Sequence, residues 1–287
     1  MAKVYDALQR AERERKRAAS DVMPSVAPLD VPAAPPKARA KLRPAKAKRS
    51  LVARLRDRLG RQSVVDTSAE VNKRRISVLQ PDSYVAEQFR ALRGRIDALA
   101  EQRPIRTVVV SSPMAGEGKT TASINLACVT AMSVGRRVLL IDCDMRKPKV
   151  HQALGLRPEA GLAEVLAGKV AFEDAVITIE GMNLDVLAVR SRPSNPSELL
   201  GSPRMRELVE KVAGSYDRVI LDTPAALGLP DAKAVSELAD GVVVVVRADV
   251  TSQQDLEAAL EALDRRRLLG LVLNGAHVDH GRYGYTS

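Results

Sequence analysis

The sequence is poor in cysteine and has no long hydrophobic run. Its only cysteines, Cys128 and Cys143, both lie within apolar segments. This usage disfavours a disulfide framework and fits a reducing compartment. No apolar stretch approaches the roughly 18 residues of a membrane-spanning helix, and the first residues are charged rather than signal-like. We therefore expect a cytoplasmic protein whose attachment to a membrane is peripheral or made through a partner.

The net charge of +10 is concentrated at one end of the sequence. Residues 1–75 contain 20 Lys or Arg against 8 Asp or Glu, and the remainder contains 25 against 27. We predict that residues 1–80 form a basic, largely disordered segment with short helices, because a chain rich in Pro, Ala, Lys and Arg has little to bury. A solvated tail is the simplest interpretation. A tether to anionic lipid, a partner helix or nucleic acid is the alternative, with nucleic acid disfavoured.

Beyond residue 80 the pattern changes to alternating helices and strands. A helix is predicted after Pro81, with one apolar stripe formed by Val85, Phe89, Leu92, Ile96 and Leu99. Nearly continuous apolar runs then predict strands at residues 106–112, 137–142, 183–189, 218–223, 241–246 and 268–274. Such runs are typical of parallel strands that helices cover on both faces. We predict an α/β domain of the P-loop NTPase type over residues 81–274, with a mostly parallel sheet.

The segment SSPMAGEGKTT, residues 111–121, follows the first predicted strand and opens a helix. Pro113 replaces the first glycine of the usual phosphate-binding loop, but the Gly-Lys-Thr ending lies in the required context. Backbone amides at a helix N-terminus bind phosphate, Lys119 reaches the β- and γ-phosphates, and Thr120 offers a hydroxyl to Mg²⁺. The predicted ATP-binding residues are Ala115, Gly116, Glu117, Gly118, Lys119, Thr120 and Thr121.

Three carboxylates follow two of the predicted strands. Asp142 and Asp144 end the strand at residues 137–142, and Asp222 ends the strand at residues 218–223. Because open α/β sheets build their sites at the carboxyl ends of strands, we expect all three to converge on the phosphate-binding loop. Mg²⁺ prefers few carboxylates and several waters, which suits this set. The predicted metal ligands are Thr120, Asp144 and Asp222.

Two basic residues and a histidine follow Asp142 and Asp144 in the sequence. Arg146 and Lys147 either steer phosphate or form a solvated basic turn, and the sequence favours neither interpretation. His151 is expected to be structural, because no second ligand lies at metal-binding spacing.

Together, SSPMAGEGKTT, LLIDCDMRKPKVH and VILDTP resemble the Walker A, Walker A′ and Walker B motifs of the bacterial tyrosine kinases (BY-kinases) of capsule and exopolysaccharide export. The segment AEQFRALR is similar to that family's E-x-x-R-x-x-R helix through Glu87, Arg90 and Arg93. RPSNPSELLGSPRM resembles its N-P-x-E-L-L segment, and LGLVLNG with a tyrosine-bearing tail resembles its C-terminus. The resemblance covers residues 81–287.

The resemblance implies an ATP-dependent protein-tyrosine autokinase that regulates polysaccharide polymerisation and export. Lys119, Asp142, Asp144 and Asp222 are then the catalytic residues, and Asp142 is the candidate acceptor of the tyrosine hydroxyl proton. The division of roles between Asp142 and Asp144 stays open. The implied phosphate acceptors are Tyr283 and Tyr285, in a mobile tail over residues 275–287 that reaches a neighbouring subunit.

The resemblance also implies partners. Glu87, Arg90 and Arg93 would lie in the interface of a ring of subunits. We expect no transmembrane domain in front of the kinase segment, and the resemblance then implies a separate membrane activator of the polysaccharide co-polymerase type. That activator would recruit the protein to the inner face of the plasma membrane. Protein tyrosines are the expected substrates, with ATP and Mg²⁺ as cofactors.

Two other functions remain as alternatives. Partition and site-placement ATPases of the same superfamily could use a basic N-terminal segment to bind DNA or membrane. They carry a signature lysine at the start of the loop, where this sequence has Met114. The second alternative is a non-catalytic adaptor that binds ATP only to assemble.

Overall fold

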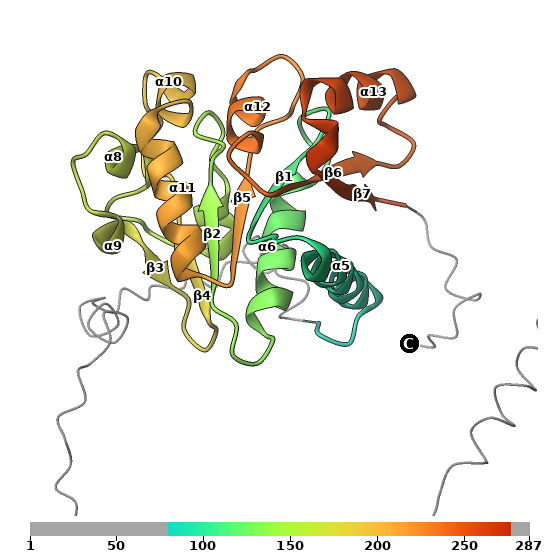
Figure 1. Cartoon of the computed structure of the whole chain (residues 1–287), viewed down its shortest axis with the longest axis horizontal. Coiled ribbons are helices and arrows are strands. Elements are labelled where there is room, and N and C mark those ends of the chain that lie inside the picture. The colour runs from blue at the N-terminus through green and yellow to red at the C-terminus, as the bar shows by residue number, and fades with distance from the viewer. Residues whose placement is uncertain (1–79, 277–287) are drawn as a thin grey trace, which may run out of the picture. The chain divides into compact units, whose positions relative to one another are not determined.

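The computed structural model describes residues 80–276, which form a seven-stranded sheet with helices on both faces (Figure 1). The strands are β1 (Thr107–Ser111), β2 (Val138–Asp142), β3 (Ile177–Thr178), β4 (Leu184–Leu187), β5 (Arg218–Asp222), β6 (Gly241–Arg247) and β7 (Leu268–Asn274). Their spatial order is β3-β4-β2-β5-β1-β6-β7, and every pairing is parallel except that of β3 with β4. The predicted fold class and all six predicted strands are confirmed. The antiparallel β3 was not predicted, because two residues carry no periodic signal.

The two faces of the sheet bury two separate apolar clusters, since successive side chains of a strand point to opposite faces. In β1, for example, Val109 belongs to one cluster and Val108 and Val110 to the other. Both faces of β1, β2, β4 and β5 are buried, which explains why these strands read as continuous apolar runs.

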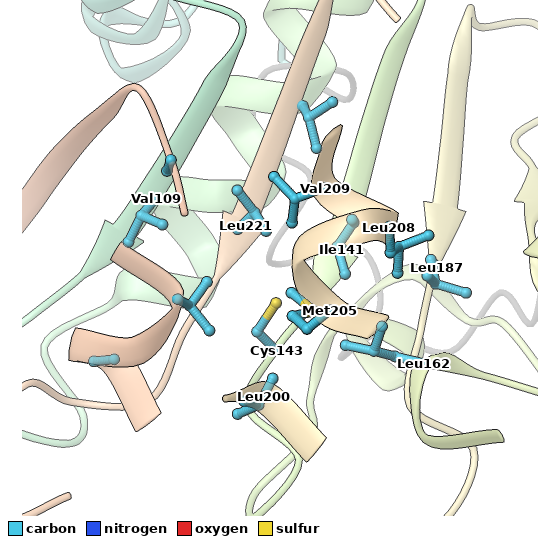
Figure 2. Close-up of a cluster of buried hydrophobic side chains, with 14 of the residues drawn as sticks. Val109, Ile141, Cys143, Leu162, Leu187, Leu200, Met205, Leu208, Val209 and Leu221 are labelled. Atoms are coloured by element: carbon cyan, nitrogen blue, oxygen red, sulfur yellow. The ribbon is translucent and has the colours of Figure 1, made fainter. Parts of the chain in front are cut away.

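The helices divide between these two faces. On one face lie α5 (Tyr84–Gln102), α6 (Lys119–Ala131) and α7 (Val150–Leu154). On the other lie α8 (Leu162–Leu166), α9 (Phe172–Ala175), α10 (Pro196–Leu200), α11 (Pro203–Ser215), α12 (Asp231–Ser236) and α13 (Gln253–Ala262). A 3₁₀ turn at Arg265–Arg267 precedes β7. Figure 2 shows side chains of α11 lying over those of β2 and β5.

The predicted helix after Pro81 is α5, and its apolar stripe packs into the cluster to which α6 also contributes. Ile96 is buried, and Phe89, Leu92 and Leu99 pack against the same cluster, whereas Val85 at the start of the helix is 39% exposed. The helix begins at an N-cap serine, Ser83, whose hydroxyl accepts the N–H of Ala86.

Polar contacts also fasten α5 to the sheet. Asp97 forms ion pairs with Arg136 at 2.7 Å and with the buried Arg218 of β5 at 2.8 Å. Arg93 donates to the Val129 carbonyl at 2.7 Å and to the Ser133 hydroxyl at 2.6 Å, at the end of α6. The helix is therefore an integral part of the domain.

Several sequence predictions fall outside the described residues. These are the disorder and short helices of residues 1–79, the basic tether, and the acceptor tail with Tyr283 and Tyr285. Within residues 80–276, no helix combines the length and apolarity that crossing a membrane requires. The boundaries at residues 80, 81, 274 and 275 stay predictions.

Candidate active site

The phosphate-binding loop joins β1 to α6, at the carboxyl edge of the sheet. Gly116 and Gly118 have φ values of 91° and 100°, a region that glycine adopts without strain. These two positions let the loop curl before α6 begins at Lys119. The N-terminal end of this 13-residue helix carries the partial positive charge that favours bound phosphate.

Lys119 and the Walker A′ loop are already joined in the structure. The Lys119 Nζ lies 3.1 Å from Asp144 Oδ2, and both side chains are largely buried. The other Asp144 oxygen accepts the N–H of Lys147 at 3.0 Å. The structure therefore places the predicted loop lysine and one predicted carboxylate in direct contact.

Asp142 and Asp222 lie side by side, because they pair in the register of β2 with β5. Both are fully buried. Asp142 accepts two backbone N–H groups, from Asp144 and Val150, each at 3.1 Å. Burial, and then the neighbouring Asp222 charge, raise the pKa of Asp142 well above its usual range. The register thus brings together two of the three carboxylates that the sequence placed at strand ends.

Asp222 offers a free oxygen where a metal would be held. Its Oδ1 accepts the Ser123 hydroxyl at 2.9 Å, whereas its buried Oδ2 has no hydrogen-bond partner. Burial raises the pKa of Asp222 to about 6, even though the Lys119 charge and the Thr120 hydroxyl lower it. A buried carboxylate oxygen without a donor is costly unless a cation or a proton satisfies it. The residues present therefore fit Mg²⁺.

The fit is that of a metal held largely by phosphate and water. Among residues 80–276, no group of three His, Cys, Asp or Glu side chains forms a ready-made metal site. A magnesium ion bound with nucleotide needs only one or two protein carboxylates. The expected ligands Thr120, Asp144 and Asp222 stay a prediction.

Arg146 does not fit the phosphate-steering interpretation. Its Nε donates to Asp231 of α12 at 2.7 Å, and its Nη2 donates to Ser197 of α10 at 2.8 Å. The Ser197 hydroxyl donates to the same carboxylate at 2.5 Å. This buried carboxylate fastens the Walker A′ loop to α10 and α12, so Arg146 has a structural role in this arrangement.

The side chains of His151 and Lys147 differ from that of Arg146 in their surroundings. The buried Nδ1 of His151 has no hydrogen-bond partner, and burial lowers the pKa of this imidazole. The structural role expected of His151 stays a prediction. Lys147 is exposed beside Asp144.

Sequence reasoning missed Thr251 and Asn274, two residues outside the P-loop that form hydrogen bonds with its residue Glu117. Glu117 is 2% exposed, and its carboxylate accepts the Met114 N–H at 2.8 Å and the Thr251 hydroxyl. Asn274 donates to the Glu117 carbonyl at 2.8 Å. Asn274 lies within the motif LGLVLNG, which was a usable signal. Nothing near Thr251 in the sequence indicated a contact 134 residues away.

Comparison with known proteins identifies the family. A family model described as an AAA domain matches residues 105–268. Tyrosine-protein kinase YwqD of Bacillus subtilis is 40% identical over 213 residues, which are 73% of this chain and 90% of that protein. The chain belongs to the bacterial tyrosine-protein kinases. Tyrosine-protein kinase wzc of Salmonella typhimurium is 33% identical over 73% of this chain, which spans only 30% of that longer relative.

Solved structures agree with this family. The chimerical protein CapA2B2 has 33% identity and a TM-score of 0.68, covering 72% of this chain and 91% of that one. The kinase domain of the Escherichia coli tyrosine kinase ETK has 28% identity and a TM-score of 0.67, covering 81% and 91%. The cell division ATPase MinD of Pyrococcus furiosus reaches a TM-score of 0.52 at 27% identity, covering 63% of this chain and 73% of that one. The tyrosine-kinase domains are therefore the better structural match.

Proposed function

We propose that the protein is an ATP-dependent protein-tyrosine autokinase that regulates the polymerisation and export of exopolysaccharide or capsule. The observation that carries the proposal is the meeting of Lys119, Asp144 and Asp222 at the mouth of a P-loop, in a chain that belongs to the bacterial tyrosine-protein kinases. Phosphoryl transfer depends mainly on positioning and on stabilisation of charge, and these residues supply both.

Each residue has a distinct task in the proposed reaction. The loop amides and Lys119 bind the β- and γ-phosphates. Thr120, Asp144 and Asp222 would hold Mg²⁺, which neutralises phosphate charge when it is bound. The tyrosine oxygen forms a bond to the γ-phosphorus as the bond from that phosphorus to the bridging oxygen of ADP breaks.

A carboxylate must receive the tyrosine proton, because a free tyrosine has a pKa of about 10. Asp142 stays the proposed acceptor, because it ends β2 directly beside Asp222 at the carboxyl edge of the sheet. Asp144 is the other candidate, since its Oδ2 lies 3.1 Å from the Nζ of Lys119, the lysine that is proposed to bind the phosphates.

The proposal is tested by incubating the purified full-length chain with Mg-ATP and detecting phosphotyrosine with an antibody. We expect phosphotyrosine on the chain. A site-placement ATPase would give no phosphotyrosine signal but would release inorganic phosphate. A non-catalytic adaptor would give no phosphotyrosine signal and release no phosphate. The alternative ATPase class is disfavoured because Met114, 49% exposed, occupies the position of its signature lysine.

The proposal includes a membrane activator of the polysaccharide co-polymerase type, which recruits the kinase to the inner face of the plasma membrane. Phosphosites mapped by mass spectrometry with and without the cytoplasmic segment of such a protein test this part. We expect more phosphotyrosine when that segment is present, and an unchanged yield would argue against the activator.

We also propose that Glu87 and Arg90 lie in a ring interface between subunits. They form an ion pair on α5, with side chains 45% and 28% exposed. Such a pair contributes only a few tenths of a kcal/mol within one helix, so it is available to a neighbouring subunit. Arg93 is different, because its guanidinium is bonded to the end of α6 in its own domain.

The assembly prediction therefore uses a double variant, Glu87→Ala with Arg90→Ala. We expect wild type to sediment as an oligomer and the double variant as a monomer. Arg95→Ala, which changes an exposed arginine on the same helix, should sediment as wild type does. Adding Arg93→Ala would also remove the hydrogen bonds between α5 and the end of α6, which would confuse a loss of packing with a loss of assembly. A wild type that is monomeric under every nucleotide condition would exclude the ring.

A further inference from the structure

The outer side of the P-loop is held by side chains from the β6–β7 edge of the sheet, which lies beside β1 in Figure 1. Three side chains make these contacts, and we call them the P-loop brace: Arg247, Thr251 and Asn274. Arg247 ends β6, Thr251 lies in the turn that follows, and Asn274 ends β7. None of them belongs to a Walker motif.

The brace contacts the acceptor groups of consecutive loop residues. Asn274 Nδ2 donates to the Glu117 carbonyl at 2.8 Å, and Arg247 Nη1 reaches the Gly116 carbonyl at 3.4 Å. The Thr251 hydroxyl donates to the Glu117 carboxylate. Asn274 packs so closely on the loop that a Cβ added at Gly118 would overlap its amide group.

These contacts decide where the loop amides point. In a trans peptide, the carbonyl of one residue and the N–H of the next point in opposite directions. Holding the Gly116 carbonyl outward therefore directs the Glu117 N–H to the other side of the loop. Holding the Glu117 carbonyl outward does the same for the Gly118 N–H. That inner side is where a P-loop binds phosphate.

Thr251 occupies the central position in the brace. Its hydroxyl accepts the Arg247 N–H at 2.9 Å and donates its own hydrogen to Glu117. The same carboxylate accepts the Met114 N–H at 2.8 Å, which closes the first turn of the loop. Asp249, within the turn, has φ of 58°, a conformation that a non-glycine residue adopts only where its surroundings hold it. The turn places the Thr251 hydroxyl between the Arg247 N–H and the Glu117 carboxylate.

We propose that the brace preorganises the P-loop for phosphate, and that Thr251 is a positioning residue for nucleotide binding. The inference rests on the proposed nucleotide-dependent function and adds residues outside its motifs. A preorganised loop binds phosphate without spending binding free energy on ordering itself. A loop released from the brace must order itself when nucleotide binds, so its affinity falls.

The test is a fluorescence titration of the full-length chain with mant-ADP in the presence of Mg²⁺. Thr251→Val keeps the side-chain shape but removes the hydroxyl, which leaves one Glu117 oxygen without its donor. We expect the Kd to rise about tenfold. Thr251→Ser restores the hydroxyl and should bind within about twofold of wild type. Thr251→Ala, which adds no bulk, should bind as weakly as Thr251→Val.

Thr178→Val is the matched control. Thr178 donates its hydroxyl to a carboxylate, Asp185 at 2.7 Å, on the β3–β4 edge of the sheet. The same chemical change there should leave the Kd unchanged, with both variants checked by thermal unfolding. Wild-type affinity in Thr251→Val, an equal loss in Thr178→Val, or no rescue by Thr251→Ser would each overturn the proposal.

The kinetic readout separates positioning from stability. Thr251→Val should raise the KM for ATP more than it lowers kcat, because the contact acts on phosphate binding before transfer. Since the titration measures binding alone, a wild type that binds mant-ADP without forming phosphotyrosine would end the kinase proposal and leave the brace intact.

Discussion

The Lys119→Met variant is expected to lose tyrosine autophosphorylation by about a thousandfold, while still folding. Lys119 is the cation that the P-loop directs at the β- and γ-phosphates, and methionine keeps its length without its charge. The loss should appear in kcat as well as in KM, because the charge on the transferred phosphoryl group is greatest in the transition state. Phosphotyrosine detection after incubation with Mg-ATP measures this directly.

The structure indicates that this variant is also less stable, so the experiment needs a control that separates lost activity from lost stability. Removing Lys119 leaves the Asp144 carboxylate without its partner at 3.1 Å, although the Lys147 N–H still donates to it. An unpaired buried carboxylate lowers the free energy of unfolding by about 1 to 3 kcal/mol. Circular dichroism and thermal unfolding should therefore show a folded but less stable domain. Lys169→Met, at an exposed lysine, is the matched control and should keep full activity. Undiminished phosphotyrosine in folded Lys119→Met would end the kinase assignment of this loop.

Replacing Tyr283 and Tyr285 together with phenylalanine is expected to remove most of the phosphotyrosine from the protein. The chain has five tyrosines, and these two lie in GRYGYTS, beyond the described residues. About 13 residues follow β7, which can extend to roughly 40 Å and so reach an adjacent active site. Each phosphate adds about −1.5 to −2 charge, which we expect to loosen the tail from cations and disassemble the ring. Phosphosite mapping by mass spectrometry measures the result.

One of the remaining tyrosines serves as an internal control. Tyr216 is 7% exposed, and its hydroxyl donates to Asp185 at 2.8 Å. Burial, and then the Asp185 charge, raise its pKa, so this hydroxyl is a poor phosphate acceptor. Tyr216→Phe should lower stability but leave the phosphotyrosine yield unchanged. If phosphotyrosine persists undiminished at Tyr5, Tyr84 or Tyr216 in the double tail variant, the tail is not the principal acceptor.

The sequence predicted the fold closely because its signals are local. Each central strand is buried on both faces, so it appears as a short apolar run that needs no knowledge of its neighbours. The P-loop was equally readable, since glycines at 116 and 118 supply the positive φ that the curl requires. Asp142 and Asp222 were expected together because the carboxyl ends of parallel strands share one edge, and the register confirms that they are adjacent.

What the sequence by itself determined is therefore the family, the sheet and the glycine-containing loop between β1 and α6. The tertiary structure decided which polar side chains already form hydrogen bonds or ion pairs within the domain. Arg93 and Arg146 look free in the sequence, yet one is bonded to the end of α6 and the other to a buried carboxylate of α12. Thr251 and Asn274 were invisible as partners of the P-loop, because their contacts span more than a hundred residues. A hydrogen bond between segments so distant is set by strand order and register, which no local pattern of residues encodes.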